Sequence, residues 1–156
     1  MATEDDIIIL IVAKKVIQMS EKKKILVVDD DSTLQTMLRM GLENCGYRVF
    51  LANNGREGLE KIQSEKLDLI ITDILMPVMD GYTFYKEVRR NKATESIPVL
   101  MLTVKNNMRD ALETLGVNFF LSKPFDPDQL LATISKLFSS KQAATTSEEL
   151  GNSLVP

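Results

Sequence analysis

Short apolar runs alternate with segments of helical periodicity along most of this chain, and that alternation constrains the fold more than any other feature. Apolar residues recur at helical spacing, as at Leu34, Leu38 and Leu42. Strands that alternate with helices pair in parallel, so we predict an α/β domain with a five-stranded parallel sheet and five helices on its two faces. The runs that read as strands are 25–28, 47–51, 67–72, 98–102 and 117–121.

Polar residues at the helix starts support the same division of the chain. Asp31 and Ser32 are suited to cap the first helix, and Gln35 is spaced to complete a capping box with Ser32. Asp126 is placed as the N-cap of the last helix, with Gln129 completing its box. We therefore expect the first and last helices of the domain to begin at these residues.

Composition divides the chain into three parts. The regular pattern fills residues 24–140, which we assign to one folded domain. Residues 141–156 are rich in Ser, Thr, Ala and Glu, and we expect them to form a disordered tail. Residues 1–23 are an N-terminal extension to the domain.

The N-terminal extension contains an unbroken apolar run at 7–13, which is too short to span a bilayer. The acids at 4–6 are unlike the basic leader of a secretory signal. Lys14 and Lys15 admit a membrane-surface helix, but its two faces are poorly separated. We favour the interpretation that Met19 is the natural start, and we expect no membrane partner.

Two absences in the composition limit the chemistry. The chain has no histidine, which excludes catalysis by a histidine base, histidine-ligated metals and a histidine phosphoacceptor. Its single cysteine, Cys45, excludes an internal disulfide and a Cys-x-x-Cys site and fits a reducing, cytoplasmic setting. A net charge of -3 argues against direct nucleic-acid binding.

Reactive side chains follow the predicted strands at their carboxyl ends, where ligands bind in open parallel sheets. Asp29 and Asp30 follow the first strand, Asp73 the third, Thr103 the fourth and Lys123 the fifth. Clustered carboxylates without His or Cys favour Mg²⁺, which binds oxygen ligands and phosphate. A lysine and a hydroxyl facing them would neutralise phosphoryl oxygens. This set predicts phosphoryl transfer onto a carboxylate.

At these positions the chain resembles the response-regulator receiver domain of two-component signalling, of the stand-alone, single-domain type. The matching segments are VVDDD at 27–31, DLIITDILMPVMDG at 68–81, VLMLT at 99–103 and FFLSKPF at 119–125. Four segments in this order are far more specific than any one of them. The resemblance implies a flavodoxin-like, doubly wound sheet with the strand order 2-1-3-4-5.

The resemblance also implies a role for each site residue. Asp73 matches the phosphoacceptor. Asp29 and Asp30 match the acidic pair that binds Mg²⁺ together with Asp73. The backbone carbonyl of Leu75 matches a further metal ligand. Two more residues take part in the switch. Thr103 matches the hydroxyl that moves to the phosphoryl group, and Lys123 matches the amine that is paired with this hydroxyl in the family.

Phe120 matches the aromatic switch residue, and the Lys123–Pro124 peptide matches one that is commonly cis. Because the chain has no histidine, the phosphoryl donor is expected on a histidine kinase or a histidine phosphotransfer protein. The resemblance also implies that phosphorylation changes the face formed by the last two helices and the last strand of the domain, within residues 108–138. This face would act on a separate effector protein or pair two copies of the chain. We expect a signalling protein rather than an enzyme.

Two alternatives remain open from the sequence. Asp29 and Asp31 also fit the Asp-x-Asp-x-Thr opening of a haloacid-dehalogenase-type phosphatase, with Asp29 as nucleophile and Asp31 as acid. That alternative leaves Asp73 unexplained. The other alternative is an interaction module with the receiver fold that takes no phosphoryl group.

The chain departs from the receiver pattern at three places. Val104 stands where most receivers have Ala, Ser or Gly, and Leu75 is apolar where many rapidly dephosphorylating relatives are polar. We predict that both residues shield the phosphoaspartate from water and prolong its life. Twenty positions separate Thr103 from Lys123, slightly fewer than in many relatives, which affects the expected output face.

Overall fold

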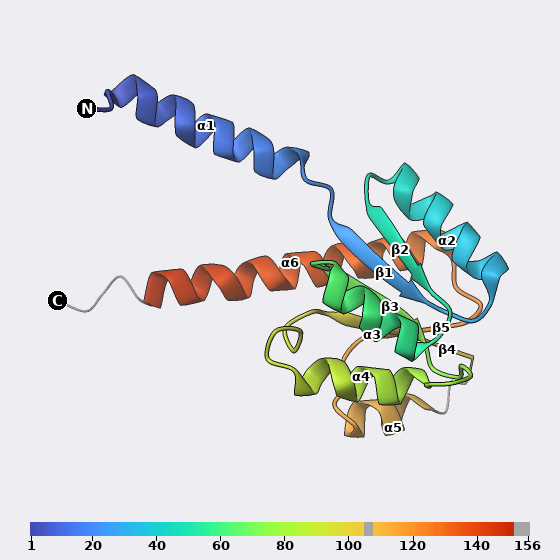
Figure 1. The fold of residues 1–156 in the computed structure, drawn as a ribbon. Coiled ribbons are helices and arrows are strands. Elements are labelled where there is room, and N and C mark those ends of the chain that lie inside the picture. Colours follow the sequence, from blue (N-terminus) through green and yellow to red (C-terminus); the bar gives the residue numbers. More distant parts are fainter. Residues whose placement is uncertain (105–107, 152–156) are drawn as a thin grey trace.

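In the computed structural model, which describes residues 1–104 and 108–151, five parallel strands form one sheet (Figure 1). Their order is β2-β1-β3-β4-β5, so the predicted flavodoxin-like topology is confirmed. Short apolar runs form these strands because both faces of the sheet are covered by helices. The strands are β1 (Lys24–Val28), β2 (Arg48–Ala52), β3 (Leu69–Asp73), β4 (Val99–Thr103) and β5 (Phe120–Ser122).

Helices follow the strands along the chain as predicted, with one addition. The described residues contain six helices rather than five, and the additional one is α1, in the N-terminal extension. None of the helices in the described part of the chain is long and apolar enough to cross a membrane. The helices are α1 (Glu4–Ser20), α2 (Ser32–Asn44), α3 (Gly55–Ser64), α4 (Gly81–Arg90), α5 (Arg109–Thr114) and α6 (Pro127–Gly151).

The sheet divides the core into two layers. Successive residues of β1 point to opposite faces, so Leu26 and Val28 pack with α3, α4 and α5, while Ile25 and Val27 pack with α2 and α6. All four side chains are fully buried. Burial on both faces fixes the register of the central strands, and with it the position of the residues at their carboxyl ends.

Two predicted boundaries differ from the structure by more than two residues. The last helix continues to Gly151, through a segment for which we expected disorder from residue 141, and residues 152–156 lie outside the described part. The last strand begins at Phe120 rather than at Val117. Gly116 has a positive φ of 82°, and the Val117 N–H donates to the Leu112 carbonyl, so these residues end α5 instead of joining the sheet.

Candidate functional site

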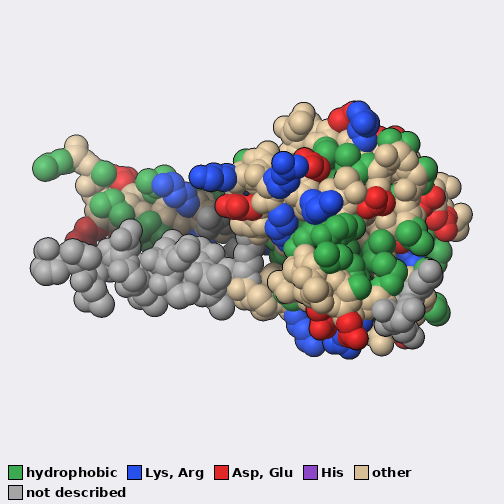
Figure 2. Space-filling model, turned by 90° about the horizontal axis from the view of Figure 1, so that it is seen from below, with side chains coloured by type: hydrophobic (Ala, Val, Ile, Leu, Met, Phe, Trp, Pro, Cys, Tyr) green, Lys and Arg blue, Asp and Glu red, His purple; other side chains and the backbone are tan. Residues whose placement is uncertain are grey.

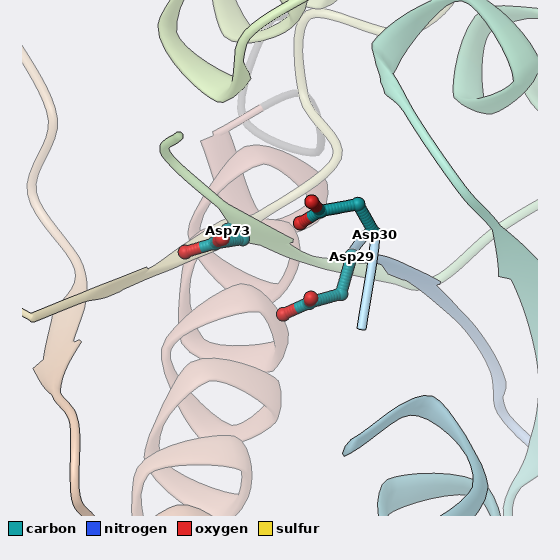
Figure 3. Close-up of side chains that lie close together, drawn as sticks. All are labelled: Asp29, Asp30 and Asp73. Carbon is teal, nitrogen blue, oxygen red and sulfur yellow. The ribbon is translucent and has the colours of Figure 1, made fainter. Parts of the chain in front are cut away.

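The parallel sheet brings the predicted site residues to one edge. Asp29 follows β1, Asp73 is the last residue of β3, Thr103 is the last residue of β4, and Lys123 follows β5. Figure 3 shows the carboxylates of Asp29 and Asp30 turned toward the same space as that of Asp73. The structure therefore places these residues together at the carboxyl edge of the sheet, as the strand ends predicted, and we call the space between their side chains the cleft.

Three carboxylates form the centre of this cleft. One carboxylate oxygen from each of Asp29, Asp30 and Asp73 lies within 4.8 Å of the other two. Asp29 is buried and Asp30 is exposed, so the group opens to solvent on one side. An all-oxygen donor set with an open side fits a hard ion such as Mg²⁺, which retains several waters. The Leu75 carbonyl as a fourth ligand remains a prediction.

Lys123 connects the buried carboxylate of Asp29 with the partly buried carboxylate of Asp73. Its Nζ lies 3.1 Å from Oδ2 of Asp29 and 3.3 Å from Oδ1 of Asp73, and its side chain is only 18% exposed. Burial by itself lowers the pKa of Lys123, but the hydrogen bonds and attraction to the two carboxylates outweigh it and raise the pKa above 10.5. Lys123 is therefore a fixed positive charge at neutral pH.

Asp73 has the opposite balance. Burial raises the pKa of its carboxyl above the ordinary 3.8, the positive charge of Lys123 lowers it, and the charge of Asp29 raises it again. The net direction is upward. An ionised Asp73 is thus less well solvated than a surface aspartate, and added positive charge in the cleft would stabilise it.

Gln35 has a structural role in this cleft that the sequence analysis assigned wrongly. Its buried side-chain amide donates to the backbone carbonyls of Asp29 and Ala52, at 2.8 Å for Ala52, and so joins the ends of β1 and β2. It does not form a capping box with Ser32, because Asp31 is the N-cap of α2. A glutamine one turn into the helix fitted either arrangement.

The ends of β4 and β5 are joined through the backbone. Thr103 is buried, and its carbonyl accepts a hydrogen bond of 2.6 Å from the Lys123 N–H. The Lys123–Pro124 peptide is cis, as the resemblance implied. Thr103 and Lys123 therefore lie next to each other at the edge of the cleft.

Phe120, the expected switch residue, is half-buried at the start of β5 and packs against the core on the side of α3, α4 and α5. The Arg109 guanidinium of α5 lies over its ring, 5.2 Å from the centroid. A cation over an aromatic face is attracted by the ring electrons. The switching of this ring remains a prediction.

Val104 and Leu75, the two residues that depart from the receiver pattern, lie at the surface. Each is 61% exposed, whereas the side chain of Asp73 is 15% exposed. Neither residue is packed into the core, so each can change its contacts without disturbing the sheet. The predicted shielding of a phosphoaspartate is therefore a question for kinetics.

Similarity to known proteins identifies the family of this domain. The family model for the response regulator receiver domain matches residues 25–135. The chain belongs to the response regulator receiver family. The matched segment runs from the first strand into the last helix, so it includes every strand end that contributes to the cleft, and the receiver domain is the unit that contains the site.

Relatives of this receiver domain include longer regulatory proteins. The chain is 39% identical over 123 residues to the alkaline phosphatase synthesis transcriptional regulatory protein PhoP of Bacillus subtilis, covering 77% of this chain and 50% of that protein. It spans about half the length of PhoP and of the probable transcriptional regulator ycf29 of Pyropia yezoensis, to which it is also similar. Similarity to these relatives therefore concerns their receiver part.

Solved structures show the same fold in single receiver domains. The chemotaxis response regulator CheY4 of Vibrio cholerae is 37% identical, with a TM-score of 0.70 over 75% of this chain and 99% of that one. The response regulator TrrA of Thermotoga maritima, solved in complex with Mg²⁺-BeF, is 34% identical, with a TM-score of 0.67 over 74% of this chain and 98% of that one.

The alternative of a haloacid-dehalogenase-type phosphatase does not agree with these findings. It requires Asp31 as an acid beside a nucleophilic Asp29. The Asp31 carboxylate instead accepts the Thr33 and Leu34 N–H groups at the start of α2, and Asp29 is 1% exposed and paired with Lys123. That alternative also leaves Asp73 unexplained.

Proposed function

We propose that this receiver domain accepts a phosphoryl group on Asp73 from a phosphohistidine of a histidine kinase or a phosphotransfer protein. The observation that carries the proposal is the position of Asp73, which belongs to a carboxylate cluster suited to Mg²⁺ and lies 3.3 Å from the Lys123 amine. A nucleophile flanked by a metal site and a fixed cation has the electrostatics that phosphoryl transfer needs.

In the proposed reaction, one Asp73 carboxylate oxygen forms a bond to phosphorus while the bond from phosphorus to the donor's ring nitrogen breaks. The nitrogen keeps that electron pair and later takes a proton. Asp29, Asp30 and Asp73 would hold Mg²⁺, which neutralises phosphoryl charge. Lys123 faces the same oxygens as a second counterion, and the Thr103 hydroxyl donates to one of them.

Phosphorylation adds nearly two negative charges to a cleft that is already acidic, which gives the switch its driving force. We propose that Thr103 moves toward the phosphoryl group and that Phe120 then turns further inward, past Arg109. This repacks the α5-β5-α6 face, by which the chain would act on a separate effector protein or on a second copy. Under this proposal, the chain turns over no substrate other than its own phosphoaspartate.

Intact mass spectrometry after incubation with Mg²⁺ and acetyl phosphate tests the proposal. We expect one phosphoryl adduct on the wild-type chain, none on Asp73→Asn and a reduced amount on Asp29→Asn. Asp31→Asn is the matched control, because asparagine also caps helices and Asp31 lies outside the acidic cluster. This control should be phosphorylated like the wild type.

Two other outcomes would reject the proposal. An adduct that survives in Asp73→Asn and disappears in Asp29→Asn would make Asp29 the nucleophile. The absence of any adduct, with either acetyl phosphate or a phosphorylated histidine phosphotransfer domain, would leave an interaction module that signals by contact alone. Retained Mg²⁺ binding, measured by titration, would show in that case that the cleft itself is intact.

A further inference from the structure

Helix α1 lies mainly before Met19, so a role for this helix concerns the chain with residues 1–18 present. In that chain the helix presents a largely exposed apolar surface. Its large apolar side chains between Ile7 and Ile17 are 49–66% exposed, whereas residues of these types are usually buried in folded proteins. The helix projects away from the sheet (Figure 1), and Figure 2 shows part of it, with hydrophobic and charged side chains at its surface. A surface of this kind marks a binding site for something outside the chain.

The charges of α1 are distributed along its length rather than around it. Glu4, Asp5 and Asp6 lie in the first turn, and Lys14 and Lys15 follow the apolar run. Of the acids, Asp6 accepts hydrogen bonds from the N–H and hydroxyl groups of the N-cap residue Thr3. A helix that lies on a bilayer needs a charged face and an apolar face, which this distribution does not supply.

One stripe of α1 combines the two charged ends with the apolar centre. At 3.6 residues per turn, Glu4, Ile8, Ile11 and Lys15 fall on one face, spaced by four, three and four residues. Glu4 and Lys15 are about 16 Å apart along the axis, with two isoleucines between them. Both charged residues are exposed, and neither makes a salt bridge within the described chain.

This stripe is complementary to itself when reversed. If two copies of α1 run antiparallel and cross midway between Ile8 and Ile11, each Glu4 meets the partner's Lys15, and each Ile8 meets the partner's Ile11. A parallel pair would instead place Glu4 against Glu4 and Lys15 against Lys15, which is repulsive. We propose that α1 binds a second copy of this chain through the stripe, as an antiparallel helix pair with two-fold symmetry.

The proposed contact is small. One short helix from each chain buries less than the roughly 1,200 Å² that marks the lower end of stable interfaces, so we expect a weak dimer that dissociates in the micromolar range. The contact lies outside the receiver domain and requires no phosphoryl group. It is therefore independent of the function proposed for Asp73 and of any pairing through the α5-β5-α6 face.

Sedimentation equilibrium of the unphosphorylated full chain, over a wide concentration range, tests the pairing. We expect a monomer–dimer equilibrium for the wild type. Ile8→Glu should raise the dissociation constant about tenfold or more, because two carboxylates would enter the apolar centre. Ile9→Glu is the matched control, since Ile9 is the same residue type and similarly exposed, at 66% against 57% for Ile8, but lies about 130° around the helix.

Charge reversal tests the orientation. Glu4→Lys and Lys15→Glu should each weaken the dimer about three- to tenfold, because each creates like-charge contacts at both ends of the pair. The double variant with both reversals should regain wild-type association, since the stripe is then complementary again. In a parallel pair the single variants would not weaken association, and the double variant would not differ from them.

Three results would overturn the proposal. These are a wild-type chain that stays monomeric at the highest concentration, an Ile9→Glu effect as large as that of Ile8→Glu, and single charge variants that associate like the wild type. A monomeric chain that sediments with vesicles of phosphatidylcholine and phosphatidylserine would assign the apolar surface to a bilayer instead. Unchanged circular dichroism of each variant shows that the fold is retained.

Discussion

The strand-end cleft and helix α1 depart from ordinary protein architecture in opposite directions. The cleft holds charge inside: Asp29 is 1% exposed, and Lys123 lies between it and Asp73. Helix α1 holds apolar side chains outside, with Ile9 66% exposed. Burial of charge is tolerated only with partners, and exposure of a large apolar surface is tolerated only with a cover.

The difference between these regions lies in where the partners come from. The cleft obtains its partners from distant parts of the same chain, because a parallel sheet gathers its strand ends at one edge. Helix α1 has no comparable partner in the described chain. Changes in the cleft should therefore alter the stability of the fold, whereas changes in α1 should alter association and leave the fold unaffected.

The largest effect is expected at Gly81, where α4 begins beside the cleft. A Cβ at this position would overlap with the backbone carbonyl oxygen of Asp73, and backbone atoms cannot move aside as a flexible side chain does. We expect Gly81→Ala to lower the free energy of unfolding by about 4 kcal/mol or more, or to prevent folding. Urea unfolding followed by circular dichroism measures the change.

Gly41 provides the control for this substitution. It lies within α2, and a Cβ there would have no neighbour within 4 Å. We expect Gly41→Ala to stabilise the chain by about 0.5–1 kcal/mol, because alanine favours helix. Equal effects at the two glycines would show that the close approach of α4 to Asp73 does not constrain the cleft.

The second largest effect is expected at Lys123. Lys123→Met keeps much of the side-chain volume but leaves the buried Asp29 carboxylate without its cation, which should destabilise the chain by about 3 kcal/mol. Since the folded-state pKa of Lys123 is raised, the stability from its charge persists at neutral pH and is lost as pH rises through that pKa.

Thermal unfolding of Lys123→Met at neutral pH, with and without Mg²⁺, measures this effect. We expect Mg²⁺ to restore part of the lost stability, because a bound cation would take over the role of the amine. Lys24→Met is the control, since Lys24 pairs with Glu65 away from the cleft and both side chains are partly exposed. A loss at Lys24 as large as that at Lys123 would contradict the role assigned to the buried pair.

Asp73 should show a smaller effect of opposite sign. Because burial raises its pKa, the folded chain binds this proton more tightly than the unfolded chain, so its contribution to stability falls as pH rises through the range between 3.8 and the raised value. At neutral pH the charge is therefore a cost. Asp73→Asn should remove that cost and stabilise the unphosphorylated chain by on the order of 1 kcal/mol, or a few degrees in Tm.

Calorimetry between pH 3 and pH 7, without Mg²⁺ and about every half unit, compares Asp73→Asn with the wild type. The stabilisation should be largest at neutral pH and disappear at the acid end, where the wild-type carboxyl is protonated. A variant that is less stable than the wild type at neutral pH would show that the ionised Asp73 strengthens the fold.

The sheet and the cleft were predictable from the sequence because both follow from local signals. Buried strands read as short apolar runs, and the polar residue after each run lies at the carboxyl edge by topology alone. The positions of Asp29, Asp73, Thr103 and Lys123 required no further information. The roles of these residues rest on the family resemblance and on the experiments proposed for them.

The remaining features depend on contacts that no local pattern encodes. Gln35 fits a capping box as well as it fits a buried bridge, and only the packing of α2 against β1 and β2 decides between them. The extension of α6 through residues 141–151 goes against the expectation drawn from polar composition. For α1, the run at 7–13 fits a helix, but its exposure is a property of the whole structure.

The smallest effect separates the two regions most directly, by the same substitution in each. Ile71 in β3 is fully buried and Ile11 in α1 is 59% exposed. We expect Ile71→Val to cost about 1 kcal/mol, since removing one buried methylene leaves a small cavity. Ile11→Val should change the unfolding free energy by less than about 0.3 kcal/mol when the chain is dilute enough to be monomeric.

Chemical denaturation at a low protein concentration measures both substitutions, and a second series at a high concentration adds the contribution of association. If α1 pairs with a second copy, the effect of Ile11→Val should grow with concentration and that of Ile71→Val should not. An Ile11→Val effect as large as that of Ile71→Val in the dilute series would mean that α1 packs on its own chain, and the contrast between the two regions would fail.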